Sequence, residues 1–255
     1  MSQTKKIYFA SDIHLGLPSY EKSLEREKLF VQWLDLIKKD AREIILLGDI
    51  FDFWFEYKRA IPRGFTRFLG KICEITDSGI PVHFFTGNHD MWIFDYLPKE
   101  TGVIIHKKPI IKEYSGKNFY LAHGDGLGPG DYAYKILKRI FASRFSQWLF
   151  ARFHPNFGLF IANSWSVHNR YSRETKEFEG EEKEWLILYS QKLLKTNQFD
   201  FMVYGHRHLP NDIKLNDNCR YINLGDWLSH FTYAVFDGTT MELKTFKKDN
   251  QTEHD

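Results

Sequence analysis

Phe84-Phe85-Thr86-Gly87-Asn88-His89-Asp90 (FFTGNHD) passes within seven residues from an apolar run to three polar side chains. The run Val82–Phe85 is rich in β-branched and aromatic residues and follows Gly79 and Pro81, which predicts a short buried strand. Gly87 permits a tight turn after it. Ligand crevices of open α/β sheets form at the carboxyl ends of strands. An ordinary loop with a helix cap has the same appearance, so the rest of the chain decides between a site and a loop.

The composition indicates a folded globular protein, since 43% of the 255 residues are hydrophobic and 27% are charged. A net charge of only +2 argues against binding of polyanions by bulk charge. Two isolated cysteines, Cys73 and Cys219, form no CxxC motif and favour a reducing compartment. The N-terminus lacks the apolar region of a signal peptide, and no run approaches the ~18 apolar residues of a spanning helix. We therefore expect a cytoplasmic protein.

The order of predicted elements indicates a layered α/β domain with mixed sheets. Helical spacing of apolar residues predicts helices over residues 20–39 and 65–76. Strands are predicted over residues 6–10, 43–47, 82–85, 117–122, 199–204, 219–224, 232–236 and 241–246. Residues 126–197 lack a strand signal and are predicted to form a helical cap inserted over the crevice. The core is then residues 1–125 and 198–247, and the polar tail 248–255 is expected to be disordered.

Five predicted strands end in carboxylate, imidazole or carboxamide side chains, most of them beside a glycine. In chain order these ends are Asp12-x-His14, Gly48-Asp49, Gly87-Asn88-His89-Asp90, His123-Gly124-Asp125 and Gly205-His206-Arg207-His208. Each end alone has a structural explanation, such as a helix cap or a buried histidine. A core has no need for such residues at every crevice-facing strand end. Together they predict a binding site.

These oxygen and nitrogen donors, without a thiolate, suit Mn²⁺, Fe or Zn²⁺ with open coordination positions. A carboxylate in the middle of the set can bridge two ions, and an ion pair clamps a phosphoryl group and generates a nucleophile. In that arrangement Asn88 supplies a ligand and His89 is an unliganded proton donor. Asp90 is expected to orient the His89 imidazole.

The five motifs DxH, GD, GNHD, HGD and GHxH, in that order, resemble those of the calcineurin-like metallophosphoesterase family. The resemblance covers residues 7–125 and 200–237. It implies a four-layer αββα fold, two divalent ions (we expect Mn²⁺, with Fe and Zn²⁺ as alternatives), and His89 as general acid or transition-state donor. By this resemblance Asp12, His14, Asp49 and His208 hold one ion, and Asp49, Asn88, His123 and His206 hold the other, with Asp49 bridging.

Two longer stretches, GDIFDFW (48–54) and HGDGLGPGDYAYK (123–135), look like the UDP-2,3-diacylglucosamine pyrophosphohydrolases of lipid A synthesis. That resemblance implies cleavage of an amphiphilic nucleotide-lipid to 2,3-diacylglucosamine 1-phosphate and UMP, with Asp131 and Tyr134 facing the substrate. Many such enzymes have Arg where this chain has His89, whereas His is ordinary in the wider family. A soluble nucleotide, a phosphodiester or a phosphoprotein is therefore an alternative substrate. A membrane-peripheral binding module without turnover is an alternative of another class.

Aromatic, aliphatic and cationic residues alternate along residues 134–165, which predicts a helix that covers acyl chains or lies in a membrane interface. We expect an apolar groove lined by several of Ile136, Leu137, Ile140, Phe141, Phe145, Trp148, Leu149 and Phe153. Lys135, Lys138, Arg139 and Arg144 are expected to face the cytosolic surface of the inner membrane. A cap packed on its own domain is the structural alternative. Basic residues are too few to favour nucleic acid.

Downstream of this segment, four polar residues are candidate contacts for a phosphate or a uridine, although a solvated helix face would have the same composition. They are Asn163, Arg170, Arg173 and Lys176.

Overall fold

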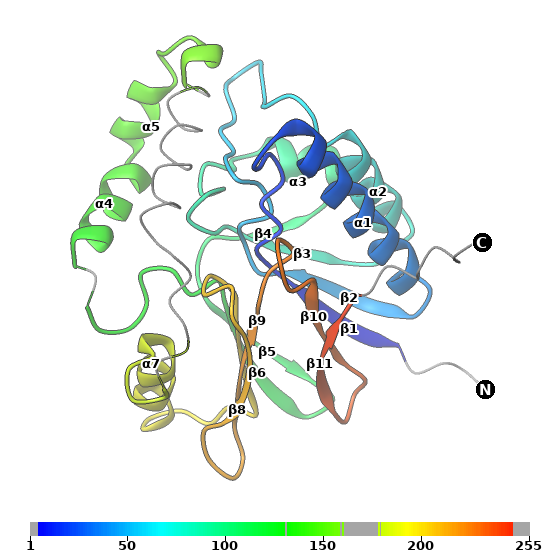
Figure 1. The fold of residues 1–255 in the computed structure, drawn as a ribbon, viewed down its shortest axis with the longest axis vertical. Coiled ribbons are helices and arrows are strands. Elements are labelled where there is room, and N and C mark those ends of the chain that lie inside the picture. The colour runs from blue at the N-terminus through cyan, green and yellow to red at the C-terminus, as the bar shows by residue number, and fades with distance from the viewer. Residues whose placement is uncertain (1–4, 131, 159, 161–177, 179, 247–255) are drawn as a thin grey trace, which may run out of the picture.

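Two β-sheets lie face to face in the computed structural model, which describes residues 5–130, 132–158, 160, 178 and 180–246 (Figure 1). The first sheet has the strand order β11-β10-β1-β2-β3-β4. Its strands are β1 (Lys6–Ala10), β2 (Ala41–Leu46), β3 (Val82–Phe85), β4 (Ile104–His106), β10 (Thr232–Phe236) and β11 (Met241–Thr245). β1 to β4 are parallel and β10 and β11 extend the sheet in antiparallel pairings, as the mixed-sheet prediction requires.

The second sheet has the strand order β5-β6-β7-β9-β8. Its strands are β5 (Ile110–Tyr114), β6 (Lys117–Ala122), β7 (Phe201–Tyr204), β8 (Pro210–Lys214) and β9 (Arg220–Leu224). The three central strands β6, β7 and β9 are parallel, and an antiparallel strand forms each edge. Buried parallel strands read as continuous apolar runs, which is why the sequence predicted β6 and β7.

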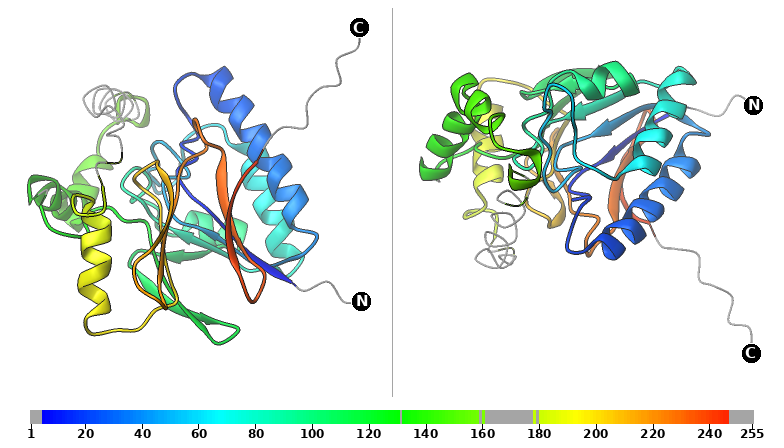
Figure 2. Two further views of the ribbon diagram at one scale, coloured as in Figure 1. Left: turned by 60° about the horizontal axis from the view of Figure 1, so that its bottom comes forward. Right: turned by 90° about the horizontal axis from the view of Figure 1, so that it is seen from above.

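Helices cover the outer face of each sheet and complete the four layers, so the predicted αββα fold is confirmed (Figure 2). α1 (Tyr20–Ile37), α2 (Thr66–Asp77) and α3 (Tyr96–Thr101) cover the first sheet, and α7 (Trp185–Leu194) covers the second. α4 (Tyr132–Ala142) and α5 (Arg144–Phe150) lie to one side of the layers (Figure 1). Among the described helices, none combines the length and apolarity needed to cross a bilayer.

Aromatic rings fill the space between the sheets. Phe119 of β6 is fully buried, and its ring centroid lies 5.9 Å from Phe9, 4.8 Å from Phe201 and 5.0 Å from Phe236. Rings at these separations contribute packing energy beyond the area they bury. This core accounts for several of the 23 phenylalanines in the chain. It also holds the two sheets at one fixed separation, so that their carboxyl strand ends meet.

The structure differs from the sequence prediction at the sheet edges and in the helical insertion. β4, β5 and β8 were not predicted, because short edge strands with polar residues or proline read as loops. α7 falls within residues 126–197, which the sequence places over the crevice. It instead packs on the second sheet through the buried Leu186 and Ile187. A helix that alternates with strands and buries an apolar face belongs to a layer of the core.

Candidate metal centre

Seven polar side chains from five strand ends converge at the carboxyl edge of the two sheets. Three clusters place their ligand atoms within 4.8 Å of one another: Asp12, His14 and His208; His14, Asp49 and His89; Asp49, His123 and His206. β1, β2 and β3 of the first sheet and β6 and β7 of the second supply these residues. Asp49 belongs to two clusters, which makes it the central carboxylate of the arrangement.

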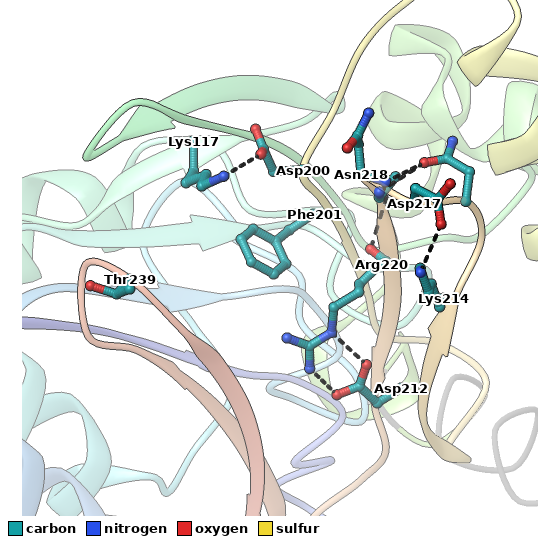
Figure 3. A pocket seen from close by; sticks show the side chains of 11 residues that line it. Lys117, Asp200, Phe201, Asp212, Lys214, Asp217, Asn218, Arg220 and Thr239 are labelled. Carbon is teal, nitrogen blue, oxygen red and sulfur yellow. Dashed lines mark hydrogen bonds and ion pairs between the residues drawn. The ribbon is translucent and has the colours of Figure 1, made fainter.

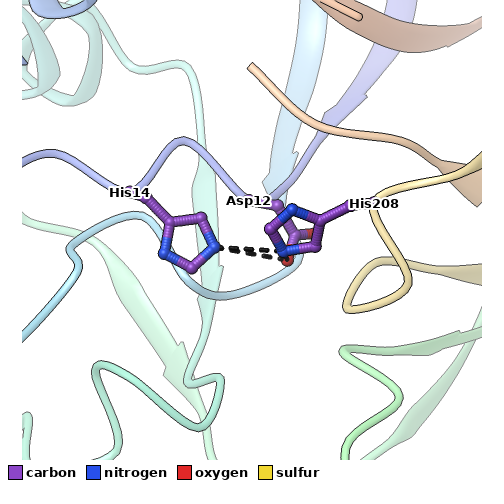
Figure 4. A group of neighbouring side chains, drawn as sticks. All are labelled: Asp12, His14 and His208. Atoms are coloured by element: carbon purple, nitrogen blue, oxygen red, sulfur yellow. Dashed lines mark hydrogen bonds and ion pairs between the residues drawn. The ribbon is translucent and has the colours of Figure 1, made fainter. Parts of the chain in front are cut away.

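In the cluster of Asp12, His14 and His208, the potential metal-ligand atoms face one another with too few protons to form hydrogen bonds between all of them. Nε2 of His14 lies 3.2 Å from Nε2 of His208, and Oδ1 of Asp12 lies 3.3 Å from the same His208 atom (Figure 4). Asp12 Oδ1 is buried but makes no geometrically acceptable hydrogen bond within the part of the chain that the structure describes. Buried polar atoms are normally satisfied. Two imidazole nitrogens and a carboxylate oxygen therefore fit a divalent cation, and these donor types suit a transition metal.

The cluster of Asp49, His123 and His206 is centred on His123. Its Nε2 lies 3.3 Å from Asp49 Oδ2 and 3.3 Å from Asn88 Oδ1. The second oxygen of Asp49, Oδ1, accepts a hydrogen bond of 2.8 Å from the His89 backbone N–H. Oδ2 of Asp49 also lies 3.9 Å from His14 Nε2. The same carboxylate therefore faces both clusters, which is the geometry that the expected bridging role needs.

Backbone strain is concentrated at these residues. Asp12, His14, Asp49, His206 and His208 all have φ between 48° and 69°, a left-handed conformation that costs non-glycine residues of order 1 kcal/mol or more. Only three other non-glycine residues in the described ranges share it. Such strain persists where the surrounding structure over-determines it, and it gathers at functional sites. The strand ends are thus shaped to aim side chains rather than to continue the sheets.

Each of three imidazoles is oriented through its second ring nitrogen. Nδ1 of His123 donates to the Leu47 carbonyl at 2.7 Å, and Nδ1 of His14 lies 3.3 Å from Asp52 Oδ1. Nδ1 of His208 lies 3.4 Å from Asp226 Oδ2. Metal-binding histidines typically use the second nitrogen in this way. Asp226 was not predicted as a site residue, although Gly225-Asp226 after β9 repeats the Gly48-Asp49 pattern after β2.

The expected partnership of His89 and Asp90 is wrong. Asp90 is fully buried, and its carboxylate accepts backbone N–H groups of Gly87 at 2.7 Å and Ile50 at 2.9 Å. His89 instead donates from Nδ1 to the Asp52 carbonyl at 2.8 Å. Asp90 therefore joins the loop after β3 to the loop after β2, because backbone N–H groups close by satisfy a carboxylate before a distant imidazole can.

Burial and the carboxylates act in opposite directions on the imidazoles. Burial lowers the pKa of His14 to about 4 and the pKa of His206 to about 3, so both rings are neutral, as ligands must be. Burial also lowers the pKa of His123, but the charge of Asp49 outweighs it and raises the pKa to about 10. Burial, with the charge of Asp49, raises the pKa of Asp90 to about 7. The centre thus favours positive charge beside Asp49.

Of the residues expected to face the substrate, the structure describes Tyr134 alone. Its hydroxyl donates to Asp125 Oδ2 at 2.7 Å, and Lys138 Nζ lies 2.6 Å from the same oxygen. Asp125 is buried two residues after His123, so α4 is tied to the metal centre. Asp131, Asn163, Arg170, Arg173 and Lys176 lie outside the described residues.

Comparison with known proteins shows which family and which relatives this chain is similar to. A model of the calcineurin-like phosphoesterase family matches residues 5–210. The UDP-2,3-diacylglucosamine hydrolase of Porphyromonas gingivalis is 40% identical over 95% of this chain and 98% of that protein. The protein of the same name from Histophilus somni is 26% identical over 88% of this chain and 92% of that protein. The solved phosphoesterase Yfce from E. coli is 18% identical, with a TM-score of 0.41 over 90% of this chain and 87% of that one.

Gly87 is a test of the centre, because a Cβ there would overlap the Asp49 carboxylate. We expect Gly87→Ala to displace Asp49 and to weaken Mn²⁺ binding by more than about 10-fold in isothermal titration of the metal-free protein. Gly70→Ala is the matched control, since no atom lies within 4 Å of a Cβ at Gly70 in α2. Unchanged Mn²⁺ binding in Gly87→Ala would contradict the placement of Asp49.

Proposed function

This chain belongs to the calcineurin-like phosphoesterase family, and we propose that it cleaves the pyrophosphate of UDP-2,3-diacylglucosamine to UMP and 2,3-diacylglucosamine 1-phosphate. The convergence of carboxylate, amide and imidazole donors around Asp49 carries the proposal of metal-dependent hydrolysis. The similarity to the Porphyromonas gingivalis enzyme over nearly the whole chain supports the substrate. A soluble nucleotide, a phosphodiester or a phosphoprotein is the second candidate.

The proposed ligand sets are Asp12, His14, Asp49 and His208 for one ion and Asp49, Asn88, His123 and His206 for the other. When bound, a pair of divalent ions stabilises a phosphoryl group as a Lewis acid and provides a nucleophile at neutral pH. Nitrogen and oxygen donors without thiolate suit Mn²⁺, with Fe and Zn²⁺ as alternatives. The contribution of the chain is the rigid placement of these donors by strained strand ends and by Asp52 and Asp226 behind them.

His89 is the proposed proton or hydrogen-bond donor to the phosphate. Its Nδ1 is held by the Asp52 carbonyl, so Nε2 is the nitrogen that remains for a substrate. Asp52 Oδ1 lies 3.5 Å from the same Nδ1 and also restrains the ring. The ring lies edge-on to His14 with centroids 4.8 Å apart. The ring therefore lies beside a proposed ligand, and His89 itself is not in the proposed ligand sets.

The outer faces of α4 and α5 are the proposed lipid-facing surface. Ile136, Ile140, Phe145, Trp148, Leu149 and Phe153 on and after these helices are each exposed by 42% to 70%. Monomeric soluble proteins rarely expose so many large apolar side chains together. The opposite face anchors the helices, because Trp92 donates to the Phe141 carbonyl at 2.9 Å and packs on Phe150. Within residues 126–197, these two helices are thus the proposed lid.

Two of the four cations expected at the membrane surface are used inside the protein. Lys138 pairs with Asp125, and Lys135 donates to the Gly128 carbonyl. Arg139 and Arg144 are exposed, and they are the proposed contacts for anionic headgroups. We place the protein peripherally on the cytosolic face of the inner membrane on this basis. No nucleic acid is proposed as a partner.

A panel of substrates tests the reaction. With Mn²⁺, we expect release of UMP from UDP-2,3-diacylglucosamine, loss of turnover with a chelator, and recovery when Mn²⁺ is restored. Phosphorus NMR follows the lipid beside a UDP-sugar, a cyclic nucleotide and a phosphopeptide. Turnover of a soluble compound in place of the lipid would support the second candidate. Lipid binding without any turnover would indicate a binding module.

His89→Ala separates chemistry from metal binding. We expect kcat to fall by about 10²–10⁴ because a proton or hydrogen bond to the transition state is lost. Metal content should stay at the wild-type level. Asp49→Ala is the contrasting variant, and it should lose both metal and turnover. An H89A protein that keeps full kcat, or that loads less metal, would refute the role of His89.

Aspartates at Phe145 and Leu149 test the lid. Burying acyl chains yields about 0.8 kcal/mol per CH₂, so losing contact with two groups should raise KM for the lipid about 10-fold or more. Hydrolysis of bis(p-nitrophenyl) phosphate should be unaffected. Leu36→Asp on α1 is the control, because Leu36 is 52% exposed, between Leu149 at 48% and Phe145 at 70%, but lies on another helix. An equal loss on both substrates would assign α4 and α5 a purely structural role.

A further inference from the structure

Arg207 stands between His206 and His208, and its guanidinium is held by the residue that precedes α7. Nε donates to both oxygens of Glu184, at 2.8 and 3.0 Å, and Nη2 donates to Oε2 at 2.9 Å. The guanidinium also lies 4.4 Å from the centroid of the Trp185 ring. Glu184 is buried. A buried, forked ion pair on an aromatic ring is rigid and directional in a way that a lysine cannot reproduce.

The loop that carries Arg207 needs such a restraint. His206 and His208 both have left-handed backbones, with φ of 69° and 57°. Gly205 has no room for a side chain because a Cβ there would overlap Asp12 and Ser11. The His206 backbone N–H donates to Asp12 Oδ2 at 2.9 Å. Arg207 is thus the residue of this strained turn whose side chain reaches outward to the α7 layer.

The two flanking histidines differ in their own support. His208 has Asp226 behind its Nδ1. For the His206 ring, the described ranges supply no hydrogen-bond partner, and its aromatic neighbours are His123 and Trp185, edge-on at 5.1 and 6.4 Å. The orientation of His206 therefore depends on the position of its loop and on Trp185. Both of these depend on the Glu184–Arg207 pair.

Residues 184–186, at the start of α7, also lie against the loop that follows His123 in the second sheet. A Cβ at Gly124 would lie 3.1 Å from Leu186 Cδ1, and a Cβ at Gly128 would lie 2.6 Å from the Trp185 carbonyl oxygen. Residues 184–186 thus pack against the loop that follows His123, and they also hold the loop of His206. Residues 184–186 therefore support both histidines among the proposed ligands of the second ion.

We infer that Glu184 and Arg207 are positioning residues for the metal ion whose proposed ligands are Asp49, Asn88, His123 and His206. The inference rests on the proposed two-ion function. Neither residue is a ligand. Together they hold the His206 loop against α7. They therefore strengthen the binding of one ion more than the binding of the other. Partners behind metal ligands typically change metal affinity by about 10- to 100-fold.

Titration of Mn²⁺ into the metal-free full chain tests the inference, with calorimetry for affinity and EPR for the spin-coupled ion pair. We expect Arg207→Ala to weaken one of two Mn²⁺ sites by about 10- to 100-fold and to replace the coupled signal by that of a single ion. Asp226→Asn, behind His208, should weaken the other site. Glu184→Gln with Arg207→Ala should lose little more than Arg207→Ala alone, because the two residues act as a unit.

Arg220→Ala is the matched control. Arg220 makes a forked ion pair with Asp212 (Figure 3) and lies 5.6 Å from the Phe201 ring centroid. It is the first residue of β9, whereas Asp226 follows the other end of that strand. Both Mn²⁺ affinities should be unchanged in that variant. Arg207→Lys keeps the positive charge but cannot form the forked ion pair with Glu184, so it should give a smaller loss of Mn²⁺ affinity at the same site. This variant tests the inference even where Arg207→Ala does not fold.

Equal weakening of both sites in Arg207→Ala, or wild-type affinity at both, would overturn the positioning role and leave the two-ion function standing. Fewer than two Mn²⁺ ions bound by the wild-type chain would instead overturn the proposed function, and the inference with it.

Discussion

Two hydrogen bonds between the sheets are the constraint on which the rest of this structure depends. His123, at the end of a strand of the second sheet, donates to the carbonyl of Leu47 in the first. The backbone N–H of His206 in the second sheet donates to the carboxylate of Asp12 in the first. Each bond uses a proposed metal ligand to join the sheets. A relative shift of the sheets would therefore separate the donors before it disturbed the aromatic core between them.

This arrangement of the site lowers the stability of the folded chain. The carboxyl groups of Asp12, Asp49 and Asp90 are all buried, and five donor residues hold strained backbones. Burial of charge is unfavourable unless opposite charge compensates it. A divalent cation supplies that charge, and a ligand that binds only the native state stabilises it. Folding stability and metal affinity are accordingly coupled here, with Asp49 as the residue common to both.

Chemistry and recognition are placed on different parts of the molecule. The proposed metal ligands sit on strand ends held by the two sheets, which restrict the movement of their side chains. The exposed apolar side chains of the proposed lipid-facing surface sit on α4 and α5, which contact the core through Trp92, Phe150 and the Asp125–Tyr134 hydrogen bond. Lipid contacts are non-directional and tolerate movement, whereas metal ligation does not. The division follows from that difference.

The sequence by itself determined a layered α/β domain with mixed sheets and the set of metal-competent strand ends, because buried strands have local apolar runs and the Gly-Asp, GNHD and GHRH motifs are contiguous in the chain. The four αββα layers followed only from the resemblance of these motifs to a known family. The sequence did not determine which groups stand behind those side chains. Asp90 binds backbone N–H groups, Asp52 holds His89, Asp226 faces His208, and Glu184 holds Arg207 across 23 residues. It likewise misplaced α7 and missed β4, β5 and β8. Those outcomes depend on which strand ends and helix faces meet in space, and periodicity along the chain carries no information about contacts between distant residues.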